Sequence, residues 1–243
     1  MPTPPPGSTC WRPGRTRAAS GNPRGSPWLP FGSFPGSYRR SGTSQAQGGR
    51  MRIGIFGTGG MADALGTQWA RAGHELMVSG RSDPAALAAR LGASAGTWRE
   101  TAAFADVVLL AVPAAAIGEV LAEAGPLAGK VLVDCTNDPD LTGTPVASRI
   151  TTDAHVVKAF NLAHVDVWRM TPPVFDGRPL SVPLCGDDPG ALDAVSTLVR
   201  DVGAKPVPAG GLDRAALLEA TAAFVIGLWF AGEDAQAILT PVG

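Results

Sequence analysis

The chain has 243 residues, of which 45% are hydrophobic, and a formal net charge of −1. These values are typical of a globular protein with one large domain or two small ones. Residues 1–50 carry seven Arg and no Asp, Glu or Lys, whereas residues 51–243 carry a charge of −8. A mildly acidic body argues against a nucleic-acid-binding domain, which usually has a basic patch.

Residues 1–50 are predicted to be a disordered extension. They contain nine Pro, nine Gly and seven Ser, and they lack the apolar periodicity needed to form a core. They also lack the apolar segment of a secretory signal, and their Pro and Gly disfavour the amphipathic helix of a transit peptide. Because an apolar strand follows Met51 at once, we interpret residues 1–50 as translated from a misassigned start. A basic tail that binds an anionic partner is the alternative.

From residue 52 onward, short apolar runs alternate with helical patterns, which predicts a parallel sheet covered on both faces. The predicted strands are 52–56, 75–79, 107–112, 131–134 and 156–160. Four helices are predicted between these strands. The first has Met61, Leu65 and Trp69 on one face, and the second runs from Asp83-Pro84 to about Leu91. The third starts with a capping box of Thr97 and Glu100 and ends at Phe104, and the fourth covers about 114–124.

The second half of the chain continues with a strand at 180–184, a helix at 189–202, a strand at 205–207 and a long helix from about 212. Charged residues bracket the apolar stretch 222–231 of that helix too closely for a membrane span, so a buried or dimer-forming helix is predicted. The predicted fold is α/β, a Rossmann-like doubly wound parallel sheet. Its domains are expected at 51–165 and, as a small C-terminal α/β portion, at 166–243.

The stretch Gly57-Thr58-Gly59-Gly60-Met61-Ala62 fits the pattern G-x-G-x-x-A. Gly57 permits a tight turn, Gly59 lets the backbone approach a pyrophosphate, and Ala62 keeps the helix close to the strand. The pattern alone also occurs in structural turns. Because it follows a strand and opens a βαβ pattern, it predicts a dinucleotide-binding site, over which the C-terminal portion closes.

The end of the second predicted strand indicates which dinucleotide binds. NAD sites usually place Asp or Glu there for the ribose 2′-hydroxyl. This chain has Ser79-Gly80-Arg81-Ser82 instead, and a guanidinium flanked by hydroxyls suits a 2′-phosphate. The predicted cofactor is therefore NADP(H), the alternative being an exposed loop Arg.

The stretch "MRIGIFGTGGMADALGTQWARAGHELMVSGRSDP" resembles the N-terminus of the NADPH-dependent reductases of the deazaflavin coenzyme F420 and the cytoplasmic domain of the STEAP metalloreductases. The likeness continues through "DVVLLAVP" (106–113), "VVKAFN" (156–161) and "LDRAALLEATAAF" (212–224), and it spans essentially all of 51–243. The resemblance implies an NADP(H)-dependent oxidoreductase in which hydride passes directly between the nicotinamide and a deazaflavin (F420) or flavin-like acceptor.

The resemblance also implies roles for residues: Thr58, Gly60 and Met61 at the pyrophosphate, Arg81 at the 2′-phosphate, Ala111, Val112 and Pro113 at the nicotinamide ribose, and Ala159, Phe160 and Asn161 at the nicotinamide and the acceptor. The predicted cofactor-binding residues are Gly57, Thr58, Gly59, Gly60, Met61, Ser79, Gly80, Arg81, Ala111, Val112, Pro113, Ala159 and Asn161. No catalytic side chain and no metal site are predicted. The chain departs from the family's Gly-Ser-Arg order at Ser79-Gly80, and from its small residues and Pro at 162–165.

Two other functions remain open: an NADPH-binding regulatory module without turnover, and a reductase of a small carbonyl or imine. The second needs a proton donor, for which His164 and Lys158 are the candidates. A lone His is more often structural, and Lys158 lies in an apolar strand, where a snorkelled or paired Lys is expected. "GTGGMADAL" also resembles pyrroline-5-carboxylate reductases, but the strands in 180–207 do not fit their helical C-terminal domain.

The cysteines Cys10, Cys135 and Cys185 form no C-x-x-C motif and are predicted to be buried free thiols in a reducing compartment. A cytoplasmic location is therefore expected. The expected partners are a small-molecule redox acceptor and a second copy of this chain in a homodimer, rather than nucleic acid or a membrane.

Overall fold

The computed structural model describes residues 49–138 and 146–233. The chain divides into two units, Met1–Ala46 and Gln47–Gly243, and the description below concerns the second. The extension predicted to be disordered is residues 1–50. All of it except residues 49–50 lies outside the described residues.

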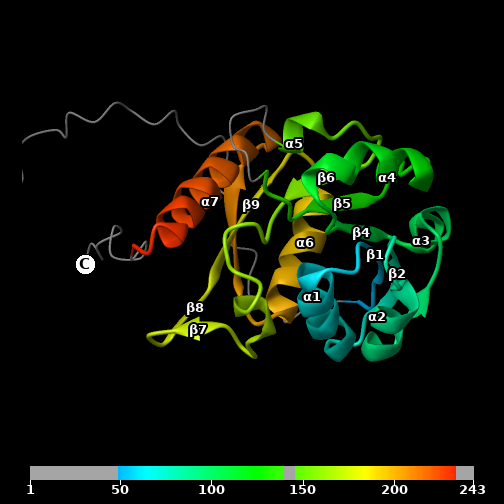
Figure 1. The fold of residues 1–243 in the computed structure, drawn as a ribbon, viewed down its shortest axis with the longest axis horizontal. Coiled ribbons are helices and arrows are strands. Elements are labelled where there is room, and N and C mark those ends of the chain that lie inside the picture. Colours follow the sequence, from blue (N-terminus) through cyan, green and yellow to red (C-terminus); the bar gives the residue numbers. More distant parts are fainter. Residues whose placement is uncertain (1–48, 139–145, 234–243) are drawn as a thin grey trace, which may run out of the picture. The chain divides into compact units, whose positions relative to one another are not determined.

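A sheet of eight strands forms the centre of the second unit, in the order β10-β9-β6-β5-β4-β1-β2-β3. Figure 1 labels β9, β6, β5, β4, β1 and β2 of this sheet. All neighbouring strands are parallel except β6 and β9. The strands are β1 (Arg52–Phe56), β2 (Glu75–Ser79), β3 (Ser94–Ala95), β4 (Val107–Leu110), β5 (Val131–Asp134), β6 (His155–Lys158), β9 (Ser181–Gly186) and β10 (Lys205–Gly210). This arrangement confirms the predicted Rossmann-like α/β fold.

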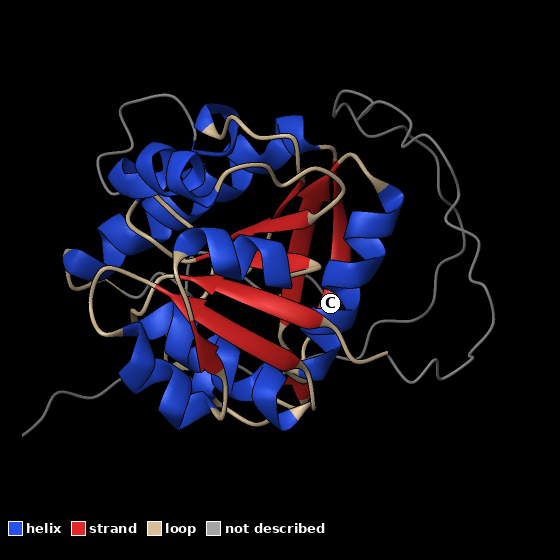
Figure 2. Cartoon of the chain, turned by 90° about the vertical axis from the view of Figure 1, so that its right-hand side faces the viewer, coloured by secondary structure: helices blue, strands red, loops and turns tan. Residues whose placement is uncertain are grey.

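Helices cover both faces of the sheet, as Figure 2 shows. Successive residues of a strand point to opposite faces, so Ile53 and Ile55 belong to one buried cluster and Phe56 to another. The first cluster packs under α1 (Gly60–Arg71), α2 (Pro84–Leu91) and α6 (Pro189–Asp201). The second packs under α3 (Trp98–Phe104), α4 (Ile117–Ala124) and α5 (Val146–Arg149).

Local signals in the sequence set where several helices begin. Asp83 caps α2 by accepting a hydrogen bond from the Ala86 N–H at 3.0 Å. Thr97 and Glu100 form the predicted capping box at the start of α3. The structure confirms both predicted helix starts. The sequence alone could predict them because each signal depends only on residues within one turn of the chain.

Other features of the fold differ from the prediction. The predicted helix over 114–124 is divided into a 3-10 turn, η1 (Ala114–Ala116), and α4. Strand β6 ends at Lys158, and Phe160 then adopts a positive φ of 63° that turns the chain. The long helix predicted from about 212 begins with a 3-10 turn, η3 (Leu212–Arg214), before the α-helix starts at Ala215. The sequence did not predict the two-residue β3, the four-residue α5, the 3-10 turn η2 (Val167–Arg169) or the hairpin of β7 (Val174–Phe175) and β8 (Arg178–Pro179), because such short elements show no periodicity.

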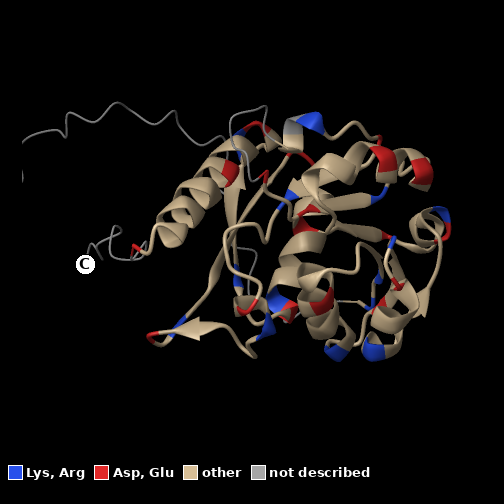
Figure 3. Ribbon diagram, viewed as in Figure 1, with Lys and Arg blue, Asp and Glu red and all other residues tan. Residues whose placement is uncertain are grey.

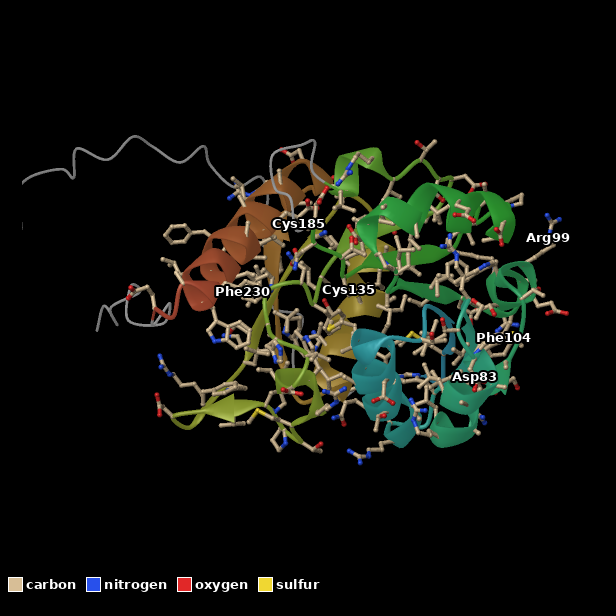
Figure 4. The ribbon with its side chains drawn as sticks, in the orientation of Figure 1. Asp83, Arg99, Phe104, Cys135, Cys185 and Phe230 are labelled. Atoms are coloured by element: carbon tan, nitrogen blue, oxygen red, sulfur yellow. The ribbon has the colours of Figure 1, made fainter. Side chains whose placement is uncertain are left out.

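The C-terminal helix α7 (Ala215–Phe230) is buried on one side only. Ala215, Glu219 and Ala222 are buried, whereas Leu217, Phe224, Ile226, Trp229 and Phe230 are exposed. Figure 4 labels Phe230 at the end of this helix. Across residues 49–138 and 146–233, no helix combines the length and apolar character that a membrane crossing requires.

Candidate cofactor site

The candidate site lies where the order of the sheet reverses, at the carboxyl ends of β1, β2 and β4. Phe56 at the end of β1 pairs with Ser79 of β2 on one side and with Leu110 of β4 on the other. The Gly57 N–H donates to the Ser79 carbonyl at 2.9 Å, and the Ala111 N–H donates to the Phe56 carbonyl at 2.8 Å. The three segments that leave these strands therefore start side by side, where ligands of doubly wound folds bind.

A cavity of about 270 Å³ opens at this point. Many of the predicted cofactor-binding residues line it: Gly57, Thr58, Gly59, Gly80, Arg81, Ala111, Val112 and Pro113. Four further residues complete the lining: Ser82, Trp98, Ala116 and Val120. The predicted residues among them come from three separate segments of the sequence, 57–59, 80–81 and 111–113, and meet in one cavity.

In the glycine turn, residues 57–59, neighbouring atoms block the Cβ position of Gly57, whereas the Cβ position of Gly59 is open. Gly57 has φ +121°, and a Cβ there would lie 2.2 Å from the Ala111 carbonyl oxygen. Gly59 has φ −80°, and a Cβ there would meet no atom within 4 Å. Helix α1 begins directly after Gly59, and the first N–H groups of a helix have no partner within it. The turn therefore fits a dinucleotide pyrophosphate.

The order Ser79-Gly80 has a packing reason. The Ser79 side chain is buried, and its hydroxyl donates to the Ile55 carbonyl at 3.4 Å instead of facing the cavity. A Cβ at Gly80 would lie 2.5 Å from Cγ2 of Thr58 in the glycine turn. The smallest residue thus occupies the close contact, and Ser82 brings a hydroxyl-bearing residue to the cavity in place of Ser79.

Arg81 is the cationic residue of the cavity lining. Its side chain is exposed, and its guanidinium forms an ion pair with the carboxylate of Glu119 in α4. A planar guanidinium at the end of β2 matches a 2′-phosphate in charge and geometry. The cavity therefore fits NADP on this side.

Trp98, the first residue of α3, was not among the predicted site residues. It lines the cavity and also an adjoining hollow of about 550 Å³ that Gly80, Pro84 and Glu100 border. Its ring packs edge-on against Phe56, with centroids 5.4 Å apart. The sequence offered a weak signal, a lone Trp after a helix cap, which does not show that α3 lies beside Arg81.

The other predicted residues lie outside the cavity lining. Gly60 and Met61 form the first turn of α1, and Ala159 is fully buried. Phe160 packs in the core between Trp69 and Trp168, with ring centroids 5.9 and 5.3 Å away. The role of these residues toward a nicotinamide stays a prediction.

Asn161 and Asn137 form a reciprocal pair after β6 and β5. The Asn161 side-chain amide donates to Oδ1 of Asn137 at 3.0 Å, and the Asn137 amide donates to the Asn161 carbonyl at 2.8 Å. The pair fixes these two loops to each other at the carboxyl end of the sheet. The predicted contact of Asn161 with the cofactor stays a prediction.

A buried charge cluster surrounds Lys158. The ammonium group, fully buried, donates to Oδ2 of Asp134 at 2.9 Å and to the Thr136 carbonyl, and it pairs with Oε1 of Glu219 at 2.8 Å. Glu219 lies in α7 and also accepts hydrogen bonds from the N–H groups of Val146 and Ala147 in α5. Lys158 is thus a paired structural residue, as the sequence predicted, and its cluster joins α5 and α7 to the sheet.

The remaining candidates for chemistry are two thiols and one imidazole. Burial raises the pKa of the Cys135 thiol to about 12 and also raises the pKa of Cys185, so neither is a ready nucleophile. Both are buried free thiols, as predicted (Figure 4); Cys10 lies outside the described residues. The His164 side chain is half exposed, and its ring stands edge-on to Trp229 with centroids 5.0 Å apart.

Comparisons with known proteins identify proteins that are similar to this chain in sequence or fold. Residues 52–138 match the family described as NADP oxidoreductase coenzyme F420-dependent. The metalloreductase STEAP3 of Rattus norvegicus is 27% identical over 186 residues, which are 73% of this chain and 38% of that protein. The chain thus spans less than half the length of this curated relative.

Two solved structures are similar in fold. An inferred F420-dependent NADP-reductase from Arthrobacter sp. FB24 has a TM-score of 0.65 and 26% identity, covering 75% of this chain and 96% of that one. A reductive aminase from Aspergillus terreus, in complex with NADPH and ethyl-5-oxohexanoate, has a TM-score of 0.59 and 23% identity, covering 75% and 63%. These comparisons confirm the predicted resemblance: the chain is similar to the coenzyme F420-dependent NADP oxidoreductases, whose family model matches it over residues 52–138.

Proposed function

We propose that this chain is an NADP(H)-dependent oxidoreductase that transfers hydride between NADP(H) and a deazaflavin, coenzyme F420, or a flavin-like acceptor. The observation that carries the proposal is the cavity in which the glycine turn, Arg81 and residues 111–113 meet. The matched family of NADP oxidoreductases supports it.

Different residues at the cavity would bind different parts of the cofactor. The glycine turn and the first turn of α1 would hold the pyrophosphate, Arg81 and Ser82 the 2′-phosphate, and residues 111–113 the nicotinamide ribose. Trp98 would offer its ring to the adenine. When bound, NADPH supplies the hydride, and the protein orients it toward the acceptor.

The surroundings of Lys158 support transfer without this residue as a proton donor. Lys158, one of the proton donors that a carbonyl or imine reductase would need, is enclosed by Asp134, Thr136 and Glu219. Hydride transfer between two rings requires no protein proton donor, which favours a deazaflavin or flavin-like acceptor.

The acceptor is tested by mixing the full chain with NADPH and, in parallel, with F420, flavin mononucleotide, a ferric chelate or a small cyclic imine. We expect the NADPH absorbance to fall with F420 or with the flavin. Turnover with the imine alone, lost on replacing His164, would instead identify a reductase with a proton donor. NADPH binding without turnover of any acceptor would contradict the proposal and indicate a regulatory module.

The choice of NADPH over NADH is tested by Arg81→Ala. We expect this change to weaken NADPH binding by about 1.5–3 kcal/mol, because a hydrogen bond to a charged group contributes about that much. NADH has no 2′-phosphate, so its dissociation constant should change little. Titration of both nucleotides by fluorescence measures the effect, and an equal loss for NADH would contradict the assignment of Arg81.

We further propose that the protein acts in the cytoplasm as a homodimer. The exposed apolar side chains of α7, among them Phe224, Trp229 and Phe230, support contact with a second copy. The buried free thiols Cys135 and Cys185 suit a reducing compartment.

A further inference from the structure

Arg81, the residue proposed to bind the 2′-phosphate, is engaged by a carboxylate of the protein itself. Its guanidinium forms an ion pair with Glu119. Arg81 lies in the loop that follows β2, whereas Glu119 lies in α4, so the pair joins two segments that both contribute to the cavity lining. Ala116 and Val120, the lining residues next to α4 and within it, flank Glu119 in the sequence.

Both side chains of this ion pair are largely exposed, 59% for Arg81 and 60% for Glu119. An exposed pair of this kind is weak and can open when a stronger partner arrives. A 2′-phosphate carries up to two negative charges, and it would need the guanidinium that Glu119 occupies. While the pair persists, the phosphate would also face a carboxylate of the same sign.

We infer that Glu119 is a specificity-determining residue that competes with the 2′-phosphate of NADP(H) for Arg81. The inference rests on the proposed NADP(H) site. NADH has a ribose hydroxyl in place of the phosphate, so the Arg81–Glu119 pair can stay closed and its carboxylate can accept a hydrogen bond from that hydroxyl. Glu119 therefore reduces the preference for NADPH over NADH that Arg81 creates.

The test is the substitution Glu119→Gln in the full chain, with dissociation constants for NADPH and NADH measured by fluorescence titration. Removing the competing charge is expected to tighten NADPH binding by about 3- to 10-fold, the scale of one exposed ion pair plus one repulsive contact. NADH binding is expected to stay the same or weaken. Because the side chain is exposed, the substitution leaves the fold intact.

Asp176→Asn is the matched control, since Asp176 is an exposed acidic residue in the turn between β7 and β8 (red in Figure 3) and lines neither the cavity nor the adjoining hollow. It makes the same change in charge away from the proposed site and should alter NADPH binding by less than about twofold. An equal gain in this control would show a general charge effect and overturn the inference.

The same titrations in an Arg81→Ala background separate this inference from the proposed function. If Arg81→Ala leaves NADPH binding unchanged, the proposed 2′-phosphate site is wrong. If Arg81→Ala weakens NADPH binding but Glu119→Gln does not tighten it, only the inference fails, and Glu119 instead orients Arg81 for the phosphate. Competition predicts that the gain from Glu119→Gln is smaller once Arg81 is absent.

Discussion

Replacing Lys158 by Met is expected to lower the free energy of unfolding by about 3–5 kcal/mol, the usual cost of removing one partner from a buried ion pair. The change leaves the carboxylates of Asp134 and Glu219 buried without their shared ammonium group. Because Glu219 also holds the N–H groups at the start of α5, the packing of α5 and α7 on the sheet should loosen as well. Urea unfolding followed by circular dichroism measures the loss.

Lys205→Met is the matched control, because Lys205 lies in strand β10 with an exposed side chain. Its replacement should change the free energy of unfolding by less than about 0.5 kcal/mol. Adding Glu219→Gln to Lys158→Met removes one of the unpaired charges and should recover part of the loss. A Lys158→Met protein as stable as the control would show that the cluster does not stabilise the fold.

The features that the sequence predicted well depend on neighbouring residues. The apolar runs of β1, β2 and β5 gave those strands with the observed bounds, and the Asp83-Pro84 and Thr97/Glu100 signals gave the starts of α2 and α3. The G-x-G-x-x-A turn is equally local, since a glycine with positive φ and a following helix suffice to form it. Once the strand order is known, the same signals place residues 57–59, 80–81 and 111–113 in one cavity.

The features that the sequence could not predict depend on distant partners. Arg81 and Glu119 are 38 positions apart, and nothing in either segment indicates that α4 faces the end of β2. Glu219 lies 73 positions beyond Val146, and its carboxylate accepts a hydrogen bond from the Val146 N–H. Trp98 likewise joins the cavity only because α3 packs beside β1 and β2. Such contacts form only when distant elements pack together, so the residue pattern of a single segment does not predict them.

Replacing Gly57 by Ala is expected to lower the free energy of unfolding by about 2–5 kcal/mol. A non-glycine residue at φ +121° is strained by about 1–3 kcal/mol, and the added methyl would lie 2.2 Å from the Ala111 carbonyl oxygen, a clash with a similar cost. To relieve it, the turn after β1 must move away from β4, which displaces the cavity lining. We therefore expect both a lower urea midpoint and weaker NADPH binding.

Gly59→Ala separates the two effects, because it adds the same methyl group two residues further along the same turn. Gly59 has an ordinary φ of −80°, and its Cβ position is open to a distance of 4 Å, so the free energy of unfolding should change by less than about 1 kcal/mol. That open space is where the proposed pyrophosphate approaches the backbone, and a methyl forced into a packed contact costs about 1–3 kcal/mol. NADPH binding should therefore weaken by about tenfold or more in a protein that folds normally. Unchanged binding in Gly59→Ala would mean that the pyrophosphate does not lie against this turn, whatever the result for Gly57→Ala, because only the Gly59 variant leaves the fold in place while altering the surface that the ligand meets.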